Sequence, residues 1–418
     1  MTVRKEVVAI CKTVKEASKK AGNISTKLKN DVLQLVADRI EGGVESIMAA
    51  NKADIKYAKE NNIESSKIER LTLDECRIIG LAKSVRDIAQ LPDPVGRVLY
   101  DVKRENGLEI KRVSTPIGVM LAIFESRPNV AIDIASLALK SGNAVILRSG
   151  KESVNSAKAL IDIFASALGE FGLDQGLVSL IENTDRDYVK YLLKMDQYID
   201  VVIPRGGHSL IQAVVKGTKI PIFRHLSGNC HTYVNQKADF DKARKIIVNA
   251  KLRRVSICGA TESLVVDKAI ASEILPKIVD DLVKEGCEVR GDSLSQKIDG
   301  RINLANLKDF GQEYLSKTIS VKIVPGITAA IKHINKYSSG HTEAIVTEDE
   351  KAAQKFFDNI DSAIVMQNSS TQFADGGEFG LGAEVGISTG KLHARGPVGL
   401  EQLTTYKYVV TSDCAVRG

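Results

Sequence analysis

Hydrophobic residues recur at helical spacing through about the first ninety positions of the chain. Apolar positions three or four apart share one face of a helix, and this spacing occurs over residues 7–17, 28–40 and 79–88. Gly22 follows the first stretch, as is common beyond the last turn of a helix, and Thr26 is in position to cap the second. The N-terminal part of the chain is therefore predicted to be helical.

A hairpin pattern interrupts the helical one after Leu91-Pro92-Asp93-Pro94. Two apolar segments, 98–100 and 110–113, flank the dipeptide Asn106-Gly107. Asparagine and glycine tolerate the positive φ angles that tight hairpin turns need. We therefore expect two antiparallel strands here, which do not fit the pattern on either side of them.

Short apolar runs alternate with amphipathic stretches from Pro116 onward. Buried strands are expected at 119–124, 144–147, 177–181, 201–203, 264–266, 319–324 and 344–346, and helices at 157–168, 188–193, 242–250, 272–283, 327–334 and 352–357. Strands alternating with helices form parallel sheets that helices cover. The alternation restarts after Tyr233, so we predict two α/β units with a boundary near Ser227–His231. A glycine-rich loop is expected over 373–399 and a last strand over 403–410.

Length and composition indicate a globular protein of more than one domain. The chain has 418 residues, of which 44% are apolar and 26% charged. The formal charge of +6 is spread without a basic block, which suits either a solvated surface or attraction of an anionic ligand. Aromatic residues make up 5% and Trp is absent, so nucleic-acid binding is not expected.

The cysteines and the chain start indicate the compartment. Six widely spaced cysteines without a CxxC pair argue against a disulfide scaffold and for a reducing environment. The charged N-terminus does not resemble a signal peptide, and no apolar run approaches the roughly 18 residues of a membrane span. Histidines and cysteines also lack metal-ligand spacing. We expect a cytoplasmic protein with no bound metal.

Two turns after predicted strands are candidate nucleotide sites. In Pro204-Arg205-Gly206-Gly207 a strand runs into a helix whose first N–H groups favour an anion, and Arg205 adds a fixed cation. Arg148 and Lys151 follow another strand, where a 2′-phosphate would account for both charges. A plain turn and a solvated helix start explain the same residues. Gly380–Gly386 is one residue too long for a dinucleotide fingerprint and lacks its strand–turn–helix context, so it is not taken as one.

Cys258 is the candidate nucleophile. Gly and Ala follow it directly, and Arg253 and Arg254 precede it, a setting that favours a thiolate. A buried structural cysteine is the alternative interpretation. Cys230 is adjacent to His231, but neighbours on a strand point to opposite faces, so these two are not expected to form a catalytic pair.

Longer motifs identify a family. They are Thr115–Val119, Phe124–Val130, Lys140–Ala144 with Arg148, Pro204–Gly207, Ser339–Ile345, Phe373–Thr389, His393–Pro397 and Thr404–Lys407. Together they resemble the γ-glutamyl phosphate reductases, a branch of the aldehyde dehydrogenase superfamily, over almost the whole chain. The resemblance implies NADPH-dependent reduction of L-glutamyl 5-phosphate to L-glutamate 5-semialdehyde and phosphate, the second step of proline biosynthesis from glutamate.

The resemblance also implies an aldehyde dehydrogenase-like α/β fold in three parts. These are a Rossmann-like NADP-binding domain (1–98 and 115–227), a catalytic α/β domain with Cys258 (228–372), and a small β oligomerisation element (99–114 and 387–418), with 373–386 as a glycine-rich loop. Exposed strand edges of such an element need a partner. A homo-oligomer is therefore expected.

Residue roles follow from the same resemblance. It implies Cys258 as the nucleophile, Arg148 beside the adenosine ribose, the turn with Gly206 and Gly207 beside the pyrophosphate, and Glu313 on the nicotinamide ribose. The expected cofactor-binding residues are Arg148, Ser149, Lys151, Arg205, Gly206, Gly207, Ser209 and Glu313.

The remaining expected site residues stabilise the oxyanion or bind the substrate. We expect Asn129, with Arg127 as an alternative, and the N–H of Cys258 to stabilise the oxyanion. Arg127, His341 and Arg395 are expected to bind the substrate, as is Arg205. Each arginine has an alternative role as a structural ion-pair partner, and His341 as a packing residue.

Two departures from the wider pattern bear on the chemistry. Hydrolytic aldehyde dehydrogenases carry an acidic base in Glu-Leu-Gly-Gly, whereas the aligned stretch here is His225-Leu226-Ser227-Gly228-Asn229. Without that base a thioester on Cys258 survives for hydride transfer or attack by phosphate. The reductase branch usually has Asn after the nucleophile, where this chain has Gly259, so a side-chain role at that position stays open.

Two other functions remain as alternatives. A CoA-acylating aldehyde dehydrogenase also lacks the acidic base. The second alternative is a non-catalytic binding protein with the same fold, which the retained Cys258 disfavours. No kinase domain is evident, so a separate glutamate 5-kinase would have to supply the glutamyl phosphate.

Overall fold

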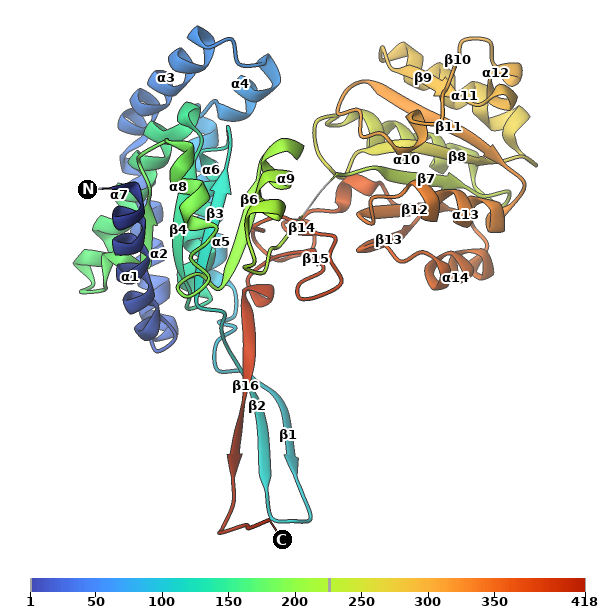
Figure 1. Cartoon of the computed structure of the whole chain (residues 1–418). Helices are drawn as coiled ribbons and strands as arrows, with labels where there is room; N and C mark the ends of the chain where they lie inside the picture. Colours follow the sequence, from blue (N-terminus) through green and yellow to red (C-terminus); the bar gives the residue numbers. More distant parts are fainter. Residues whose placement is uncertain (1, 225–226, 418) are drawn as a thin grey trace. The chain divides into compact units, whose positions relative to one another are not determined.

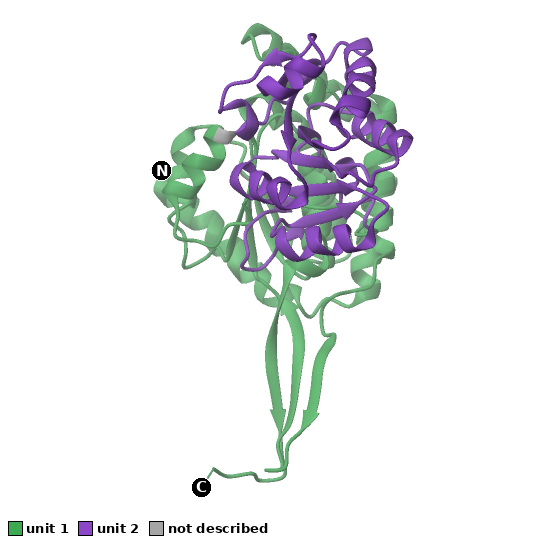
Figure 2. Ribbon diagram, turned by 90° about the vertical axis from the view of Figure 1, so that its right-hand side faces the viewer, with its two compact units in different colours: residues 1–224, 380–386, 398–418 green, residues 225–379, 387–397 purple. Residues whose placement is uncertain are grey.

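The computed structural model describes residues 2–224 and 227–417, and their contacts divide the chain into two units. Unit 1 comprises residues 1–224, 380–386 and 398–418, and unit 2 comprises 225–379 and 387–397 (Figure 2). Each unit has its own parallel sheet, so the predicted α/β architecture is confirmed. In the described part of the chain, no helix is both long and apolar enough to cross a membrane.

Unit 1 is built on a four-stranded parallel sheet in the order β5-β4-β3-β6. The strands are β3 (Val119–Phe124), β4 (Ala144–Ser149), β5 (Val178–Leu180) and β6 (Val201–Arg205). Every residue of β3 and β4 is buried, as expected for parallel strands covered on both faces. The chain moves outward from β3 to β5 and then returns to pair β6 with β3, so the strand order reverses between β3 and β6. Doubly wound sheets bind ligands at such a reversal.

Helices surround this sheet (Figure 1). They are α1 (Val3–Ala21), α2 (Thr26–Gly42), α3 (Val44–Glu60), α4 (Ser65–Leu71), α5 (Glu75–Gln90), α6 (Asn129–Lys140), α7 (Val154–Glu170), α8 (Arg186–Leu192) and α9 (His208–Gly217). Right-handed crossovers place α6 and α7 on one face and α8, which packs with α1, on the other. The cap of α2 is Ser25 and not Thr26 as expected: the helix begins at Thr26, and the Ser25 side chain accepts the N–H of Leu28.

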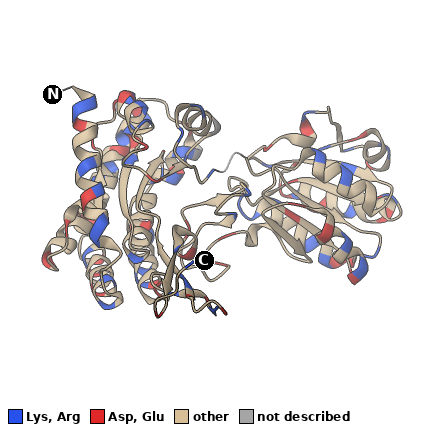
Figure 3. Cartoon of the chain, turned by 60° about the horizontal axis from the view of Figure 1, so that its bottom comes forward, with Lys and Arg blue, Asp and Glu red and all other residues tan. Residues whose placement is uncertain are grey.

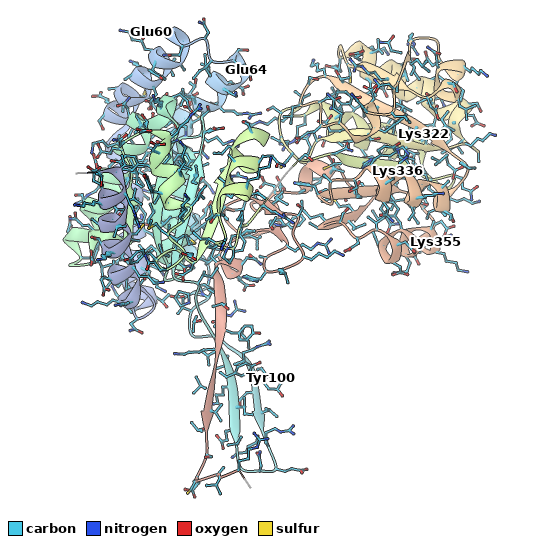
Figure 4. The ribbon with its side chains drawn as sticks, in the orientation of Figure 1. Glu60, Glu64, Tyr100, Lys322, Lys336 and Lys355 are labelled. Atoms are coloured by element: carbon cyan, nitrogen blue, oxygen red, sulfur yellow. The ribbon has the colours of Figure 1, made fainter. Side chains whose placement is uncertain are left out.

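A three-stranded antiparallel sheet completes unit 1. It has the order β1-β2-β16, with β1 at Val98–Lys103, β2 at Glu109–Pro116 and β16 at Thr404–Thr411. The predicted hairpin and terminal strand are therefore confirmed, and Gly107 has the positive φ of +83° that the turn requires. This sheet extends away from the rest of unit 1 (Figure 1), and Tyr100 projects from it (Figure 4).

Unit 2 contains a seven-stranded parallel sheet in the order β10-β9-β11-β8-β7-β12-β13. Its strands are β7 (Cys230–Val234), β8 (Thr261–Asp267), β9 (Glu288–Gly291), β10 (Asn303–Leu304), β11 (Thr318–Val324), β12 (Thr342–Val346) and β13 (Ile364–Gln367). Its helices are α10 (Phe240–Leu252), α11 (Ala271–Lys284), α12 (Ser293–Ile298), α13 (Ile327–Tyr337) and α14 (Glu350–Asn359). Leu264 and Val266 of β8 pack with α10 and α11, whereas Val265 packs with α13 and α14, so helices cover both faces.

Several elements of unit 2 were not predicted. Strand β7 carries the buried polar residues His231 and Thr232, which weaken its hydrophobic pattern, and β9 and β13 are short. The units separate after Arg224, a few residues before the predicted boundary. The expected loop after Phe373 contains one short ladder, β14 (Ile387–Ser388) with β15 (Gly396–Pro397).

Residues 387–397 lie outside the small β element to which the sequence assigned them. They group with unit 2. The reason is local packing, because Ile387 lies in a hydrophobic cluster with Ile364 and Ala374 of that unit. Of the assigned C-terminal segment, only the part from Val398 onward groups with unit 1.

Candidate active site

The predicted cofactor residues of unit 1 follow neighbouring parallel strands. Strand β3 lies between β4 and β6, and these strands end at Phe124, Ser149 and Arg205. Arg148, Ser149 and Lys151 therefore lie at the same edge of the sheet as the turn after β6 and the segment with Arg127 and Asn129 after β3. This is the edge at which doubly wound sheets bind ligands.

Two buried polar atoms near the end of β4 have no hydrogen-bond partner in the described part of the chain. Arg148 is 8% exposed, and its Nη2 donates to the carbonyl oxygen of Thr184 at 2.7 Å. Arg148 Nε and the hydroxyl of Ser149 are buried without a hydrogen-bond partner among residues 2–224 and 227–417. Burial lowers the pKa of the Arg148 guanidinium. Unpartnered buried polar atoms are costly, which favours a ligand that bonds to them.

The turn between β6 and α9 presents backbone to this edge. A Cβ at Gly206 would lie 2.6 Å from Leu210 Cδ2 and 2.7 Å from Glu125 Oε2, so a larger residue there would have to displace the ends of these two side chains. The N–H of Gly207 donates to the Glu125 carboxylate at 3.3 Å. A carboxylate thus already occupies part of the anion position that the sequence predicted. Sequence reasoning missed Glu125, because no local pattern shows that β3 and β6 pair.

Arg205 and Asn129 each have a defined neighbour. The Arg205 guanidinium packs on Gly386, where a Cβ would lie 2.7 Å from Nη1. Asn129, the first residue of α6, donates from Nδ2 to Asp133 at 3.1 Å. Burial raises the pKa of Asp133 to about 6, and the bond from Asn129 and the charge of Arg205 oppose that rise. These contacts hold both side chains at the end of the sheet.

Cys258 lies in unit 2, in the loop between α10 and β8. It is partly buried and packs against the cluster of Ile364, Ala374 and Ile387. Arg253 and Arg254, which precede it, are exposed, and Arg253 Nε donates to Gln372 at 3.0 Å. The interpretation of Cys258 as a sealed structural cysteine therefore does not fit its exposure.

The backbone of Gly228 supports Cys258. A Cβ at Gly228 would lie 2.1 Å from the carbonyl oxygen and 2.6 Å from the Cα of Cys258. The N–H of Gly228 donates to Glu313 Oε1 at 2.8 Å, across 85 residues of sequence. Glu313 thereby lies beside the loop that carries Cys258. The acidic-base position, His225, is outside the described residues.

Cys230 and His341 lie beside the candidate nucleophile Cys258. Cys230 Sγ is 3.1 Å from the Cys258 carbonyl oxygen and 3.5 Å from His341 Nδ1. His231 points the other way, with its Nδ1 3.0 Å from Glu343 Oε2. The prediction that Cys230 and His231 do not pair is confirmed. Sequence reasoning did not find the contact of Cys230 with Cys258, because it joins residues 28 positions apart.

Arg395 borders a pocket of unit 2. The pocket measures about 520 Å³ and is lined by Arg395, Phe373, Phe379, Gln367, Ser369 and the strand β13 among others. Arg395 Nη1 donates to the Asp361 carboxylate at 2.7 Å. That ion pair is the alternative role considered for it, although its position at the pocket also suits an anionic ligand.

The other predicted residues and charges are dispersed. Lys151 and Ser209 are exposed, and Arg127 is partly buried in the connection from β3 to α6. Lys and Arg lie among Asp and Glu in both units (Figure 3). Within residues 2–224 and 227–417, no group of three His, Cys, Asp or Glu side chains is placed to hold a metal ion.

Comparison with known proteins places the chain in one family. A model of the aldehyde dehydrogenase family matches residues 2–292. The chain is 49% identical to a γ-glutamyl phosphate reductase of Paramagnetospirillum magneticum over 93% of this chain and 92% of that one. It is 47% identical to the γ-glutamyl phosphate reductase of Thermoanaerobacter pseudethanolicus, over 99% of this chain and 100% of that one. The crystal structure of the γ-glutamyl phosphate reductase of Thermotoga maritima matches with a TM-score of 0.96 and 43% identity, covering 99% of this chain and 100% of that one.

Proposed function

This chain belongs to the γ-glutamyl phosphate reductase branch of the aldehyde dehydrogenase family, and we propose that it reduces L-glutamyl 5-phosphate with NADPH through a thioester on Cys258. The products are L-glutamate 5-semialdehyde and phosphate, as in the second step of proline biosynthesis from glutamate. The observation that carries the mechanism is the partly exposed thiol of Cys258 on a loop that the backbone of Gly228 supports.

The residues of unit 1 fit a dinucleotide phosphate. Arg148 Nε and the hydroxyl of Ser149, which have no hydrogen-bond partner in the described part of the chain, are donors where a 2′-phosphate would bind. The Gly206–Gly207 turn before α9 would meet the pyrophosphate in place of the Glu125 carboxylate, which the N–H of Gly207 now contacts. Lys151, Arg205 and Ser209 would add to this site. When bound, NADPH supplies the hydride. The family uses NAD or NADP, and the buried cation Arg148 favours NADP.

Cys258 acts as the nucleophile. Its thiolate forms a bond with the acyl carbon, the bond from that carbon to the phosphate oxygen breaks, and phosphate leaves with the electron pair. The N–H of Cys258 and the amide of Asn129 are the proposed donors to the carbonyl oxygen. After reduction of the thioester carbon, the carbon–sulfur bond breaks and the sulfur recovers its electron pair. Cys258 is then a thiolate again.

Cationic residues would hold the substrate. Arg395 faces the pocket of unit 2, where it keeps its ion pair with Asp361 while it binds a carboxylate or phosphate. Arg127 is proposed as a further substrate contact on the basis of the family motifs. His341, also expected there, is fully buried with its Nδ1 beside Cys230 and Thr342, so its alternative role as a packing residue is proposed instead. Glu313 is proposed to bind the nicotinamide ribose.

Self-association is a separate proposal. The sheet of β1, β2 and β16 exposes large apolar side chains: Val98 is 54% exposed, Tyr100 50%, Tyr408 59% and Val410 52%. Apolar side chains along strand edges favour burial against another chain. We expect a homo-oligomer, which sedimentation velocity of the purified protein will test. A monomer at micromolar concentration would contradict it.

The reverse reaction provides the test of function. L-glutamate 5-semialdehyde with phosphate should reduce NADP faster than NAD, and neither acyl-CoA with NADPH nor semialdehyde with CoA should react. Cys258→Ala should abolish turnover and leave NADPH binding nearly unchanged. Activity of Cys258→Ala near the parent level would refute the mechanism, and turnover with CoA in place of phosphate would favour the CoA-acylating alternative.

A further inference from the structure

The thiol of Cys230 contacts the peptide group of the proposed nucleophile. Cys230 begins β7, and its Cα pairs with that of Thr261 at the start of β8, shortly after Cys258. The Cys230 side chain is fully buried, and its Sγ lies 3.1 Å from the Cys258 carbonyl oxygen. At this distance the S–H group donates a hydrogen bond to that oxygen.

Cys230 remains protonated in this environment. Burial raises the pKa of its thiol well above the ordinary value, and the nearby charges of Glu343 and Cys258 raise it further. Its other close neighbour is His341, whose pKa burial lowers to about 4, so that the imidazole is neutral near pH 7. The donor to the Cys258 carbonyl is therefore retained across the neutral range of pH.

Gly228 restricts the same peptide group from another side. Its backbone packs against the Cα and the carbonyl oxygen of Cys258 with no room for a methyl group. The hydrogen bond from Gly228 to Glu313 fixes that backbone in turn. If the Cys258 peptide rotated, its carbonyl would lose the thiol donor in a buried setting, which is unfavourable.

We propose that Cys230 is a positioning residue, whose S–H···O=C hydrogen bond fixes the peptide plane of Cys258 and with it the direction of the attacking sulfur. This inference deepens the proposed function and rests on Cys258 as its nucleophile. A small displacement of the attacking sulfur lowers the rate of the chemical step, whereas substrate binding through other residues is little affected. The effect should therefore appear in kcat rather than in KM.

Three substitutions separate positioning from packing. Cys230→Ser keeps a donor, Cys230→Val keeps an apolar volume without a donor, and Cys230→Ala removes both. Cys287→Ala is the matched control, because Cys287 is also buried in unit 2 and its Sγ donates to the Glu288 carbonyl oxygen at 3.7 Å, away from Cys258. Semialdehyde- and phosphate-dependent reduction of NADP is measured for each, with the melting temperature by circular dichroism.

The expected result is a kcat about tenfold lower for Cys230→Val and Cys230→Ala, with KM for the semialdehyde within about twofold. Cys230→Ser should stay within about threefold of the parent kcat, and Cys287→Ala should match the parent. If Cys230→Val equals Cys287→Ala in kcat, or if Cys230→Ser is as slow as Cys230→Val, the positioning role is wrong. Should Cys230→Ala not fold, the Ser and Val pair still decides.

A failure of the proposed function can be distinguished from a failure of the positioning role. Cys258→Ala, assayed alongside, reports whether the reaction needs this sulfur at all. Activity in Cys258→Ala would overturn the nucleophile and the positioning role together. An inactive Cys258→Ala with unimpaired Cys230 variants would overturn only the role of Cys230.

Discussion

Lys251 and Glu262 form a fully buried ion pair that closes the loop carrying Cys258. Lys251 lies near the end of α10 and Glu262 near the start of β8, so the pair joins the two ends of that loop. Glu262 Oε1 also accepts the N–H of Leu315 at 3.2 Å. The pair therefore connects the nucleophile loop with the segment that carries Glu313.

Removal of one partner should destabilise unit 2. Above pH 7, where Glu262 is ionised, Lys251→Met leaves its carboxylate buried without a cation, which is expected to cost about 3 kcal/mol of unfolding free energy. The double variant Lys251→Met/Glu262→Leu should recover part of that loss, because no buried charge remains. Urea denaturation followed by circular dichroism measures both. Equal stabilities of the single and double variants would show that the charge itself is not what costs stability.

The pH dependence of stability should reflect Glu262. Burial raises its pKa from 4.5 to about 7, although Lys251 opposes the rise. Between these values the folded state binds more protons than the unfolded state, so the contribution of Glu262 to stability falls as pH rises from 4.5 to about 7 and is level above that. Glu262→Gln should remove this decline. The unfolding free energy of the parent and of Glu262→Gln is measured from pH 5 to 8. If the two plots of unfolding free energy against pH run parallel, the role of Glu262 is contradicted.

A methyl group at Gly228 should disable the nucleophile. Gly228→Ala places a Cβ 2.1 Å from the Cys258 carbonyl oxygen, and both contacts are backbone, so the loop must move. We expect kcat to fall more than about a hundredfold. Gly300→Ala is the control, because a Cβ there meets nothing within 4 Å. Steady-state kinetics of the two variants tests this, and equal rates would mean that the loop tolerates displacement.

Loss of Arg148 should weaken NADPH binding selectively. Arg148→Ala removes the buried cation proposed for the 2′-phosphate, so KM for NADPH should rise about tenfold or more while KM for NADH changes less than about threefold. Lys158→Ala is a suitable control, since Lys158 is a partly exposed cation that pairs with Glu182. Equal effects on both cofactors would assign Arg148 to structure rather than to phosphate recognition.

The candidate site was only partly accessible from sequence. The turn at Gly206, the cation Arg148 and the candidate nucleophile Cys258 could be proposed from the sequence, because each follows or precedes a strand with a clear pattern or belongs to a family motif. Glu125 was missed, since its contact with Gly207 joins residues 82 positions apart. Strand β7 was missed because buried polar side chains such as His231, paired with Glu343, replace the apolar residues expected of a buried strand.

The sequence by itself determined the local elements: the continuous apolar runs of β3 and β4, the turn at Asn106-Gly107, and a cysteine followed by small residues. Only the tertiary structure decided which residues meet, such as Gly228 and Cys230 on the backbone of Cys258 and Asp361 on Arg395. The physical reason is range. Periodicity and turn chemistry act between near neighbours in the chain, whereas these contacts depend on strand order and register, which packing of the whole sheet selects.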